Sequence, residues 1–251
     1  MKQNLSVKNL YVSRDTTPVV NGVSFDIGEG ETHILMGPNG SGKSTLLASL
    51  AGLEHAQITK GTIRVGSVNI TNHTPEKRAH LGFFLGFQHP PEIPGVSIAT
   101  MLRHAKVGSL RDRKKIDIAA FAKQLKQISV QLGVDQGFIS RTLNEGFSGG
   151  ERKKSEILQL LMLEPRFAFL DEIDSGLDVD ALSLCLKALR DLQEKTRASY
   201  LFVTHNPILL AHVHPTRVHI MIDGCIVKSG GDELMKAIEA RGFEQFMKQK
   251  A

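Results

Sequence analysis

A run of glycines that ends in a lysine and two hydroxyl residues is the clearest chemical signal in this chain. It fits the phosphate-loop pattern G-x-x-x-x-G-K-[ST] at every fixed position and consists of Gly37, Pro38, Asn39, Gly40, Ser41, Gly42, Lys43, Ser44 and Thr45. Glycines allow the backbone to curl so that its N–H groups point at the β- and γ-phosphates of a nucleotide. Lys43 adds a positive charge there, and Ser44 offers its hydroxyl to Mg²⁺. The segment therefore predicts a site for a nucleoside triphosphate.

Two adjacent carboxylates follow a second apolar run and predict the chemistry of the site. Residues 167–170 are all apolar, so we expect a buried strand that ends at Asp171. There Asp171 can hold Mg²⁺, directly or through water. Glu172 can polarise the attacking water if the chain turns, because a general base must lie within hydrogen-bond reach of its proton. Alone the pair could be a solvated acidic turn, but beside a phosphate loop it predicts nucleotide hydrolysis.

Two further polar residues stand where the predicted elements change. Gln88 lies at the junction between the first stretch of the chain and a helical region, where its amide oxygen can reach Mg²⁺ or water. His205 follows a predicted strand at 200–203, and a neutral histidine there can hydrogen-bond the γ-phosphate. Neither residue type carries the assignment by itself. Their places in the chain favour a role in hydrolysis for both.

The elements that must position these residues alternate between strands and helices. Expected strands are 5–7, 19–27, 33–36, two within 63–70, 167–170, 200–203, 217–222 and 225–227, and expected helices include 44–53 and 180–194. Strands that alternate with helices predict an α/β fold with a largely parallel, covered sheet. We expect a single domain over residues 1–251. Its core comprises about 1–89 and 163–251, and a helical region of about 90–162 is inserted.

Length and composition agree with that fold. The chain has 251 residues, of which 41% are apolar, so a sizeable core is expected. There is no apolar run near 18 residues and no apolar signal core at the N-terminus, so we expect no membrane insertion. Cys185 and Cys225 are far apart and suit small core residues in a reducing compartment. The net charge of +5 is mild and proves contact neither with an acidic partner nor with nucleic acid.

In this order the motifs resemble those of the ATP-binding cassette (ABC) family, and the resemblance covers essentially the whole chain. In the family's terms the segments are the Walker A loop (37–45), the Q-loop residue (Gln88), the signature (147–151), Walker B (167–171), the catalytic base (Glu172), the D-loop (174–178) and the switch histidine (His205). The resemblance implies an ABC nucleotide-binding domain. That domain has a RecA-like P-loop core, an antiparallel β subdomain and an inserted α-helical subdomain, and it uses ATP and Mg²⁺.

The resemblance also implies that each ATP lies between two copies of the chain. The Walker A loop of one copy would face the signature of the other in a transient, ATP-dependent homodimer. Ser148, Gly149 and Gly150 lead a helix whose positive N-terminus can face a γ-phosphate, with Ser148 and Gly150 donating hydrogen bonds. Glu151 replaces the commoner glutamine of the signature. It could slow turnover, and it could equally cap its helix.

Three more expectations concern single residues near these motifs. Asp178, in the D-loop, is expected to take part in the nucleotide site. Tyr11 lies 26 positions before Gly37, where the family places an aromatic that stacks on adenine, although it could also pack locally on its strand. Lys153 or its neighbour Lys154 is expected to pair with an acid of the 172–174 segment in a resting state.

Segments 87–96, 145–154 and 172–178 resemble one branch of the family more closely, the ATPase of the Suf iron–sulfur cluster assembly system. That resemblance implies a cytoplasmic complex of two ATPase copies with the scaffold proteins SufB and SufD, without nucleic acid. Pro90, Pro91 and Pro94 predict a stiff exposed segment in which Ile93 and Val96 could anchor a partner.

Two alternatives remain at the level of sequence. The ATPase subunit of a membrane ABC transporter would have nearly the same chemistry and a different partner. A nucleic-acid-associated ATPase would use the basic surface, although translation-type ABC proteins usually carry two cassettes and this chain carries one.

Overall fold

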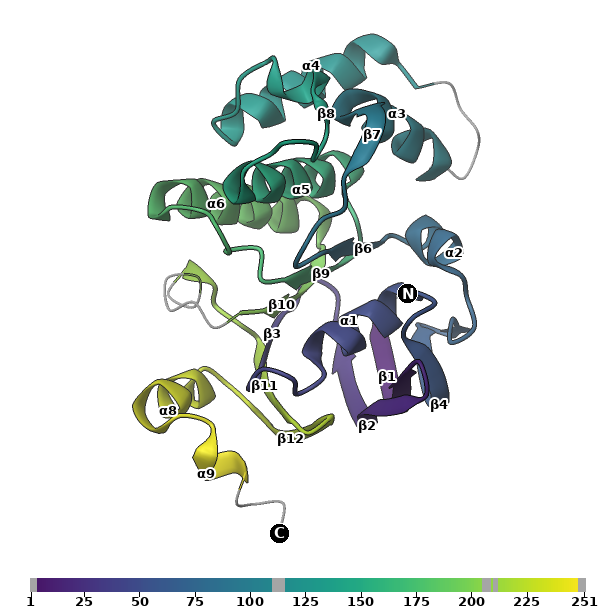
Figure 1. Ribbon diagram of the computed structural model, residues 1–251, viewed down its shortest axis with the longest axis vertical. Coiled ribbons are helices and arrows are strands. Elements are labelled where there is room, and N and C mark those ends of the chain that lie inside the picture. Colours follow the sequence, from purple (N-terminus) through teal and green to yellow (C-terminus); the bar gives the residue numbers. More distant parts are fainter. Residues whose placement is uncertain (1–3, 110–115, 205–208, 210–211, 248–251) are drawn as a thin grey trace.

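The computed structural model describes residues 4–109, 116–204, 209 and 212–247 (Figure 1). A six-stranded sheet in the order β12-β11-β3-β10-β9-β6 forms its centre. Neighbouring strands from β11 to β6 run parallel, and β12 is antiparallel to β11. The strands are β3 (Thr32–Met36), β6 (Phe83–Gly86), β9 (Phe167–Asp171), β10 (Ser199–Val203), β11 (Arg217–Ile222) and β12 (Cys225–Gly230).

Every residue of β3, β9 and β10 is buried. Near-continuous apolar runs are typical of parallel strands that are covered on both faces. Because β3, β10 and β9 are parallel neighbours, Gly37, Thr204 and Asp171 lie at the same edge of the sheet, where the carboxyl ends of these strands meet. The predicted strands and their order along the chain are confirmed, and the hairpin turn at Asp223 and Gly224 joins β11 to β12.

A second, antiparallel sheet has the order β2-β1-β4-β5. Its strands are β1 (Leu5–Arg14), β2 (Thr17–Ile27), β4 (Gln57–Val65) and β5 (Val68–Asn69). Helix α1 (Lys43–Ala51) lies beside it in Figure 1, and Leu46, Leu47 and Leu50 share one buried cluster with residues of both sheets. The short helix α2 (Pro75–His80) leads from this sheet to β6.

The segment between β6 and β9 is mostly helical. It contains α3 (Ile98–Ser109), α4 (Ile118–Gln131), a 3-10 turn (Phe138–Ser140) and α5 (Gly149–Leu163). Figure 1 shows α3 and α4 at the end of the molecule away from β1 and β2. Sequence reasoning missed a two-stranded sheet of β7 (Ile93–Ser97) and β8 (Thr142–Leu143) in this segment.

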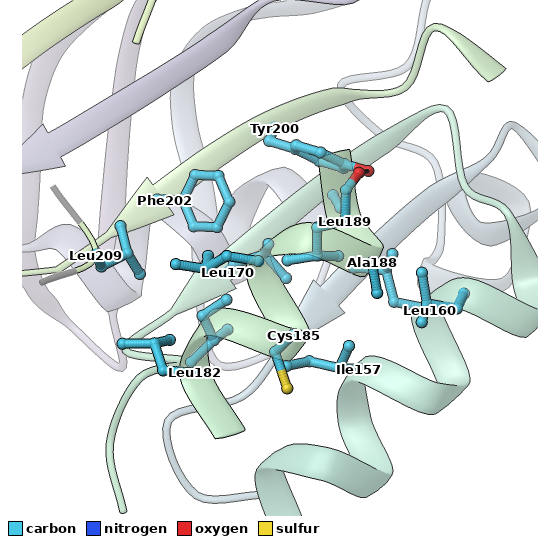
Figure 2. Close-up of a cluster of buried hydrophobic side chains, with 14 of the residues drawn as sticks. Ile157, Leu160, Leu170, Leu182, Cys185, Ala188, Leu189, Tyr200, Phe202 and Leu209 are labelled. Atoms are coloured by element: carbon cyan, nitrogen blue, oxygen red, sulfur yellow. Dashed lines mark hydrogen bonds between the residues drawn. The ribbon is translucent and has the colours of Figure 1, made fainter. Parts of the chain in front are cut away.

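Helices α5 and α6 (Val179–Thr196) pack together and cover one face of the central sheet. Figure 2 shows Ile157 of α5 and Leu182, Cys185 and Leu189 of α6 packed near Leu170, Tyr200 and Phe202 of β9 and β10. Each large apolar side chain buried in this way contributes about 1.5–3 kcal/mol relative to exposure. The predicted core position of Cys185 is confirmed, because its side chain is fully buried.

The chain ends in α8 (Glu233–Arg241) and α9 (Glu244–Met247). Among the described residues, no helix has the length and apolarity needed to cross a bilayer.

Candidate nucleotide-binding site

The phosphate loop connects the end of β3 to the start of α1. A Cβ atom at Gly37 would lie 2.1 Å from the backbone oxygen of Met221 in β11, so only glycine fits there. Gly42 precedes α1 with a φ of 102°, a left-handed conformation that favours glycine. These two positions explain why the loop can curl tightly against β11 and aim the free N–H groups of α1 outward.

Lys43 is buried and holds the loop together. Its Nζ donates to the backbone oxygens of Gly37 at 2.8 Å and of Pro38 at 3.0 Å. Burial lowers the pKa of Lys43, and the charges of Asp171 and Glu172 oppose that shift. Among the described residues no carboxylate lies within ion-pair distance of Lys43. A phosphate would supply the anion that this cation lacks.

Asp171 ends β9 beside the phosphate loop. It is buried, and burial raises its pKa, while a hydrogen bond from the hydroxyl of Ser44 lowers it. In the part of the chain that the structure describes, its Oδ1 has no hydrogen-bond partner. An unpartnered buried carboxylate oxygen next to a hydroxyl is the kind of hard oxygen donor set that Mg²⁺ prefers. The residues present therefore fit a magnesium ion.

The chain turns at Glu172, which is the condition that we expected a general base at this position to need. Its φ is 49°, which is uncommon for a residue with a Cβ atom, and its N–H donates to the oxygen of Val203 at 2.9 Å. Gln88 Nε2 donates to Glu172 Oε2 at 2.8 Å. The structure thus brings together two predicted residues that are 84 positions apart.

Lys43, Gln88 and Glu172 line one cleft of about 530 Å³, and Asp171 is not among its described walls. Its walls are phosphate-loop residues between positions 39 and 45 together with Arg14, Val19, Gln88 and Glu172. A larger cleft of about 730 Å³ lies around His73 and Arg78, and none of the predicted site residues lines it. The smaller cleft is therefore the one that predicted site residues line.

Tyr11 is not among the described residues that line the cleft. Its hydroxyl would lie 3.1 Å from a Cβ atom at Gly22, and Lys60 Nζ lies 5.3 Å from its ring centroid. Arg14, from the same strand, lines the cleft instead. The pairing of β1 with β2 shifts register next to Tyr11 and again after Val12, so alternation along the sequence does not tell which side chain faces the nucleotide. Arg14 and Val19 line the cleft, and sequence reasoning did not predict either of them.

The signature residues open α5 as predicted. Ser148 is the N-cap, and its hydroxyl accepts from the N–H of Glu151 at 3.2 Å while Glu151 Oε2 accepts from the N–H of Ser148 at 2.9 Å. Arg141 forms an ion pair with the other oxygen of Glu151. The bond from Ser148, with Arg141 adding, lowers the pKa of Glu151. Of the two readings of Glu151, the structure shows the helix cap.

The start of α5 touches the D-loop. A Cβ atom at Gly150 would lie 2.8 Å from the oxygen of Gly176, so the two loops pack closely. Asp174 accepts from the hydroxyl of Thr204 at 3.2 Å, and Asp178 is the N-cap of α6, where Oδ1 accepts from Ala181 N at 2.7 Å. Neither the signature nor the D-loop is among the described residues that line the cleft.

His205 and Lys153 are two further residues for which the sequence predicted a role. His205 lies outside the described residues, so its role stays a prediction; the strand before it, β10, ends at Val203 next to β9. Lys153 forms its ion pair with Glu156, at 3.3 Å, where sequence reasoning expected an acid of the 172–174 segment. A buried partner three residues away on the same helix was available, and sequence spacing alone does not reveal that burial.

The sequence profile of the ABC transporter family matches residues 20–175, which is more than half of the chain. The chain therefore belongs to the ABC family, and it is an ATPase of the ABC type.

Among its relatives, the chain is 42% identical over 241 residues to the probable ATP-dependent transporter SufC of Escherichia coli strain K12, which covers 95% of this chain and 97% of SufC. It is also 42% identical over 242 residues to the probable ATP-dependent transporter ycf16 of Cyanophora paradoxa, covering 96% and 93%. A probable ABC transporter ATP-binding protein of Streptococcus pyogenes is 43% identical over 239 residues, covering 95% and 93%. The resemblance to SufC is confirmed.

Solved structures show the same fold. An ATP-binding subunit of an ABC transporter superposes with a TM-score of 0.79 at 22% identity over 98% of both chains. A dimeric ATP-binding cassette with ADP and Pi bound gives a TM-score of 0.78 at 19% identity, covering 90% of this chain and 98% of that one. The predicted fold class is confirmed, whereas the boundaries of the core and the helical subdomain stay predictions.

Proposed function

We propose that this ATPase hydrolyses Mg²⁺-ATP in a site that is completed by a second copy of the chain, and that it drives conformational change in a SufB–SufD scaffold. One observation supports the proposal that a second copy completes the site. The described walls of the cleft include the phosphate loop, Gln88 and Glu172, while the signature opens a different helix and is absent from those walls. One copy therefore offers half of a site.

The phosphate loop binds the nucleotide. Its N–H groups and the start of α1 face the β- and γ-phosphates, and Lys43 exchanges carbonyl partners for phosphate oxygens. Arg14 and Val19 stand at the cleft wall formed by β1 and β2, where the base is expected. A guanidinium plane can stack on a purine ring. The stacking role predicted for Tyr11 has less geometric support.

Ser44, Asp171 and Gln88 are the residues that would hold Mg²⁺. When bound there, Mg²⁺ would supply positive charge that offsets the negative charge of the phosphates. The Oδ1 atom of Asp171 has no hydrogen-bond partner among the described residues. The carboxyl group of Asp171 already accepts a hydrogen bond from the hydroxyl of Ser44. Gln88 must turn its amide toward the ion, because its NH₂ group is engaged by Glu172 in this state.

Glu172 acts as the general base. Its carboxylate accepts a proton from the water whose oxygen forms a bond to the γ-phosphorus, and the bond to the bridging oxygen breaks to leave ADP and phosphate. Gln88 must release Glu172 Oε2 before water can bind it. His205 is expected to contact the γ-phosphate.

The second copy supplies the signature. Ser148, Gly149 and Gly150 open α5, a helix of 15 residues whose N-terminus favours an anion. Asp178 follows in the D-loop and caps α6 from an exposed position. Because Glu151 is paired with Arg141, its charge is offset at this surface.

The scaffold is proposed from resemblance. The identity of 42% to E. coli SufC extends over nearly the whole of both chains. The proposed contact with SufB and SufD is at β7, where Ile93 is 41% exposed and follows Pro90 and Pro91. A cytoplasmic complex with two ATPase copies belongs to the same proposal.

The relatives named as ABC transporter ATP-binding proteins favour a second candidate, the ATPase subunit of a membrane transporter. An affinity pull-down of the chain from its native host separates the two. Co-purified SufB and SufD support the scaffold, and integral membrane permeases in their place support the transporter. Ile93→Asp should weaken either association without changing ATP binding.

A further inference from the structure

Two charged side chains on α5 are buried just beyond the signature. Lys153 and Glu156 are each 3% exposed, and they form an ion pair at 3.3 Å between Nζ and Oε2. The nucleotide chemistry described above does not use them. A buried ion pair is seldom retained for stability alone, because apolar residues of similar volume stabilise a fold equally well or better.

The pair binds both backbone polar groups of Phe87. Glu156 Oε1 accepts from Phe87 N at 2.6 Å, and Lys153 Nζ donates to Phe87 O at 2.5 Å. Phe87 immediately follows β6 and immediately precedes Gln88. The backbone that carries Gln88 is therefore fixed to α5 from both sides.

Lys153 reaches a second segment as well. Its Nζ lies 3.4 Å from the backbone oxygen of Asp171, the residue that precedes Glu172. One pair of side chains thus contacts the residue before Gln88 and the residue before Glu172. These are the two residues that hydrogen-bond to each other at the cleft.

We propose that Lys153 and Glu156 are positioning residues that set the contact between Gln88 and Glu172 from the helix that carries the signature. A movement of α5 is then transmitted through Phe87 and Asp171 to the two groups that must separate before hydrolysis. This inference rests on the roles proposed above for Gln88 and Glu172.

A double variant separates positioning from packing. Lys153→Met with Glu156→Met replaces the pair by apolar side chains of similar length and leaves no buried charge unpaired, and urea unfolding checks that the double variant is folded. With both charges gone, nothing in the pair holds Phe87. We expect kcat for ATP to fall at least tenfold while KM stays within twofold, because the phosphate loop is unchanged. A folded double variant with wild-type kcat would overturn the proposal. A loss of kcat/KM that comes only from a higher KM would overturn it as well.

A second variant tests the route through Gln88. Glu156→Gln keeps its volume and an acceptor for Phe87 N–H but removes the charge that faces Lys153. If the pair acts through Gln88, Glu156→Gln should lower kcat in the wild-type background and have no further effect after Gln88→Ala. Additive losses in that cycle contradict the proposal even if the methionine variant fails to fold.

An ion pair between the C-terminal ends of α5 and α6 is the matched control. Lys195 and Glu164 interact at 2.9 Å with side-chain exposures of 68% and 28%. Lys195→Met with Glu164→Gln should leave kcat within 1.5-fold of wild type. Glu172→Gln, measured in parallel, tests the proposed hydrolysis separately. If this variant still hydrolyses ATP, the assignment of Glu172 as the base is wrong. The comparison of kcat among the pair variants still decides the role of Lys153 and Glu156.

Discussion

The phosphate loop and the start of α5 each contain a buried lysine, and the two lysines are compensated differently. Lys43 donates to two backbone oxygens and has no carboxylate within ion-pair distance among the described residues. Lys153 also donates to backbone oxygens but is paired with Glu156. A buried cation without an anion is suited to receive one from a ligand. A buried cation with its own anion is suited to hold parts of the protein together.

The largest expected effect is the loss of ATP binding when Lys43 is replaced. Lys43→Ala should weaken binding of Mg²⁺-ATP at least 100-fold, because it removes the charge that faces the phosphates. The same change should lower the free energy of unfolding without nucleotide by only about 1 kcal/mol, since it removes hydrogen bonds to backbone oxygens and leaves no carboxylate without its partner. Calorimetry and urea unfolding check the two halves. Retained binding would mean that the Lys43 cation does not serve the ligand.

The opposite outcome is expected at α5. Lys153→Ala should leave ATP affinity nearly unchanged and reduce the free energy of unfolding by about 3 kcal/mol, because Glu156 and the backbone of Phe87 lose a buried partner. Burial already raises the pKa of Glu156 to about 7, so part of the cost is relieved by protonation. Urea unfolding at pH 7 measures it. Equal effects of the two lysine variants on both quantities would remove the distinction between them.

A smaller effect, on KM for ATP, is expected at the wall of the cleft. Arg14→Ala should raise KM for ATP about fivefold by removing a stacking partner of the base, with kcat unchanged. GTP should be affected to the same degree, because a guanidinium stacks on either purine. Tyr11→Ala is the matched control from the same strand and should stay within twofold. If the tyrosine variant loses affinity and the arginine variant does not, the original expectation for Tyr11 is correct.

The histidines His33 and His219 form a third buried polar group. His33 Nδ1 lies 3.0 Å from His219 Nε2, and Ser229 Oγ lies 2.8 Å from His219 Nδ1. Burial, with His33 and Arg217 adding, lowers the pKa of His219 to about 3. The folded protein therefore favours neutral His219, so this contribution to stability is present above pH 6.5 and is lost as the pH falls toward 3.

Between pH 7 and pH 5.5 the loss from His219 should be about 1.2 kcal/mol of unfolding free energy. Urea unfolding of wild type and of His219→Gln at both pH values isolates it, because the glutamine keeps hydrogen-bonding groups and does not titrate. An identical pH dependence in the two proteins would show that His219 is not held neutral by the fold.

The sequence predicted most of the fold and the groups of the cleft. The glycines, Lys43 and the paired carboxylates occur in local patterns whose geometry follows from a strand, a loop and a helix. The orientation of Tyr11 and Arg14 could not be predicted, because register shifts between β1 and β2 change which side chains face the cleft. The role of Lys153 was also hidden, since three-residue spacing on a helix does not tell whether the pair is buried against another segment.

In the function proposed here, one copy of the chain contains half of each ATP site. Sedimentation velocity of Glu172→Gln tests it most directly, because this variant should bind Mg²⁺-ATP without hydrolysing it. If two copies complete each site, this variant is a monomer without nucleotide and with ADP, and a dimer with Mg²⁺-ATP. A Glu172→Gln protein that is saturated with ATP and remains a monomer would contradict it.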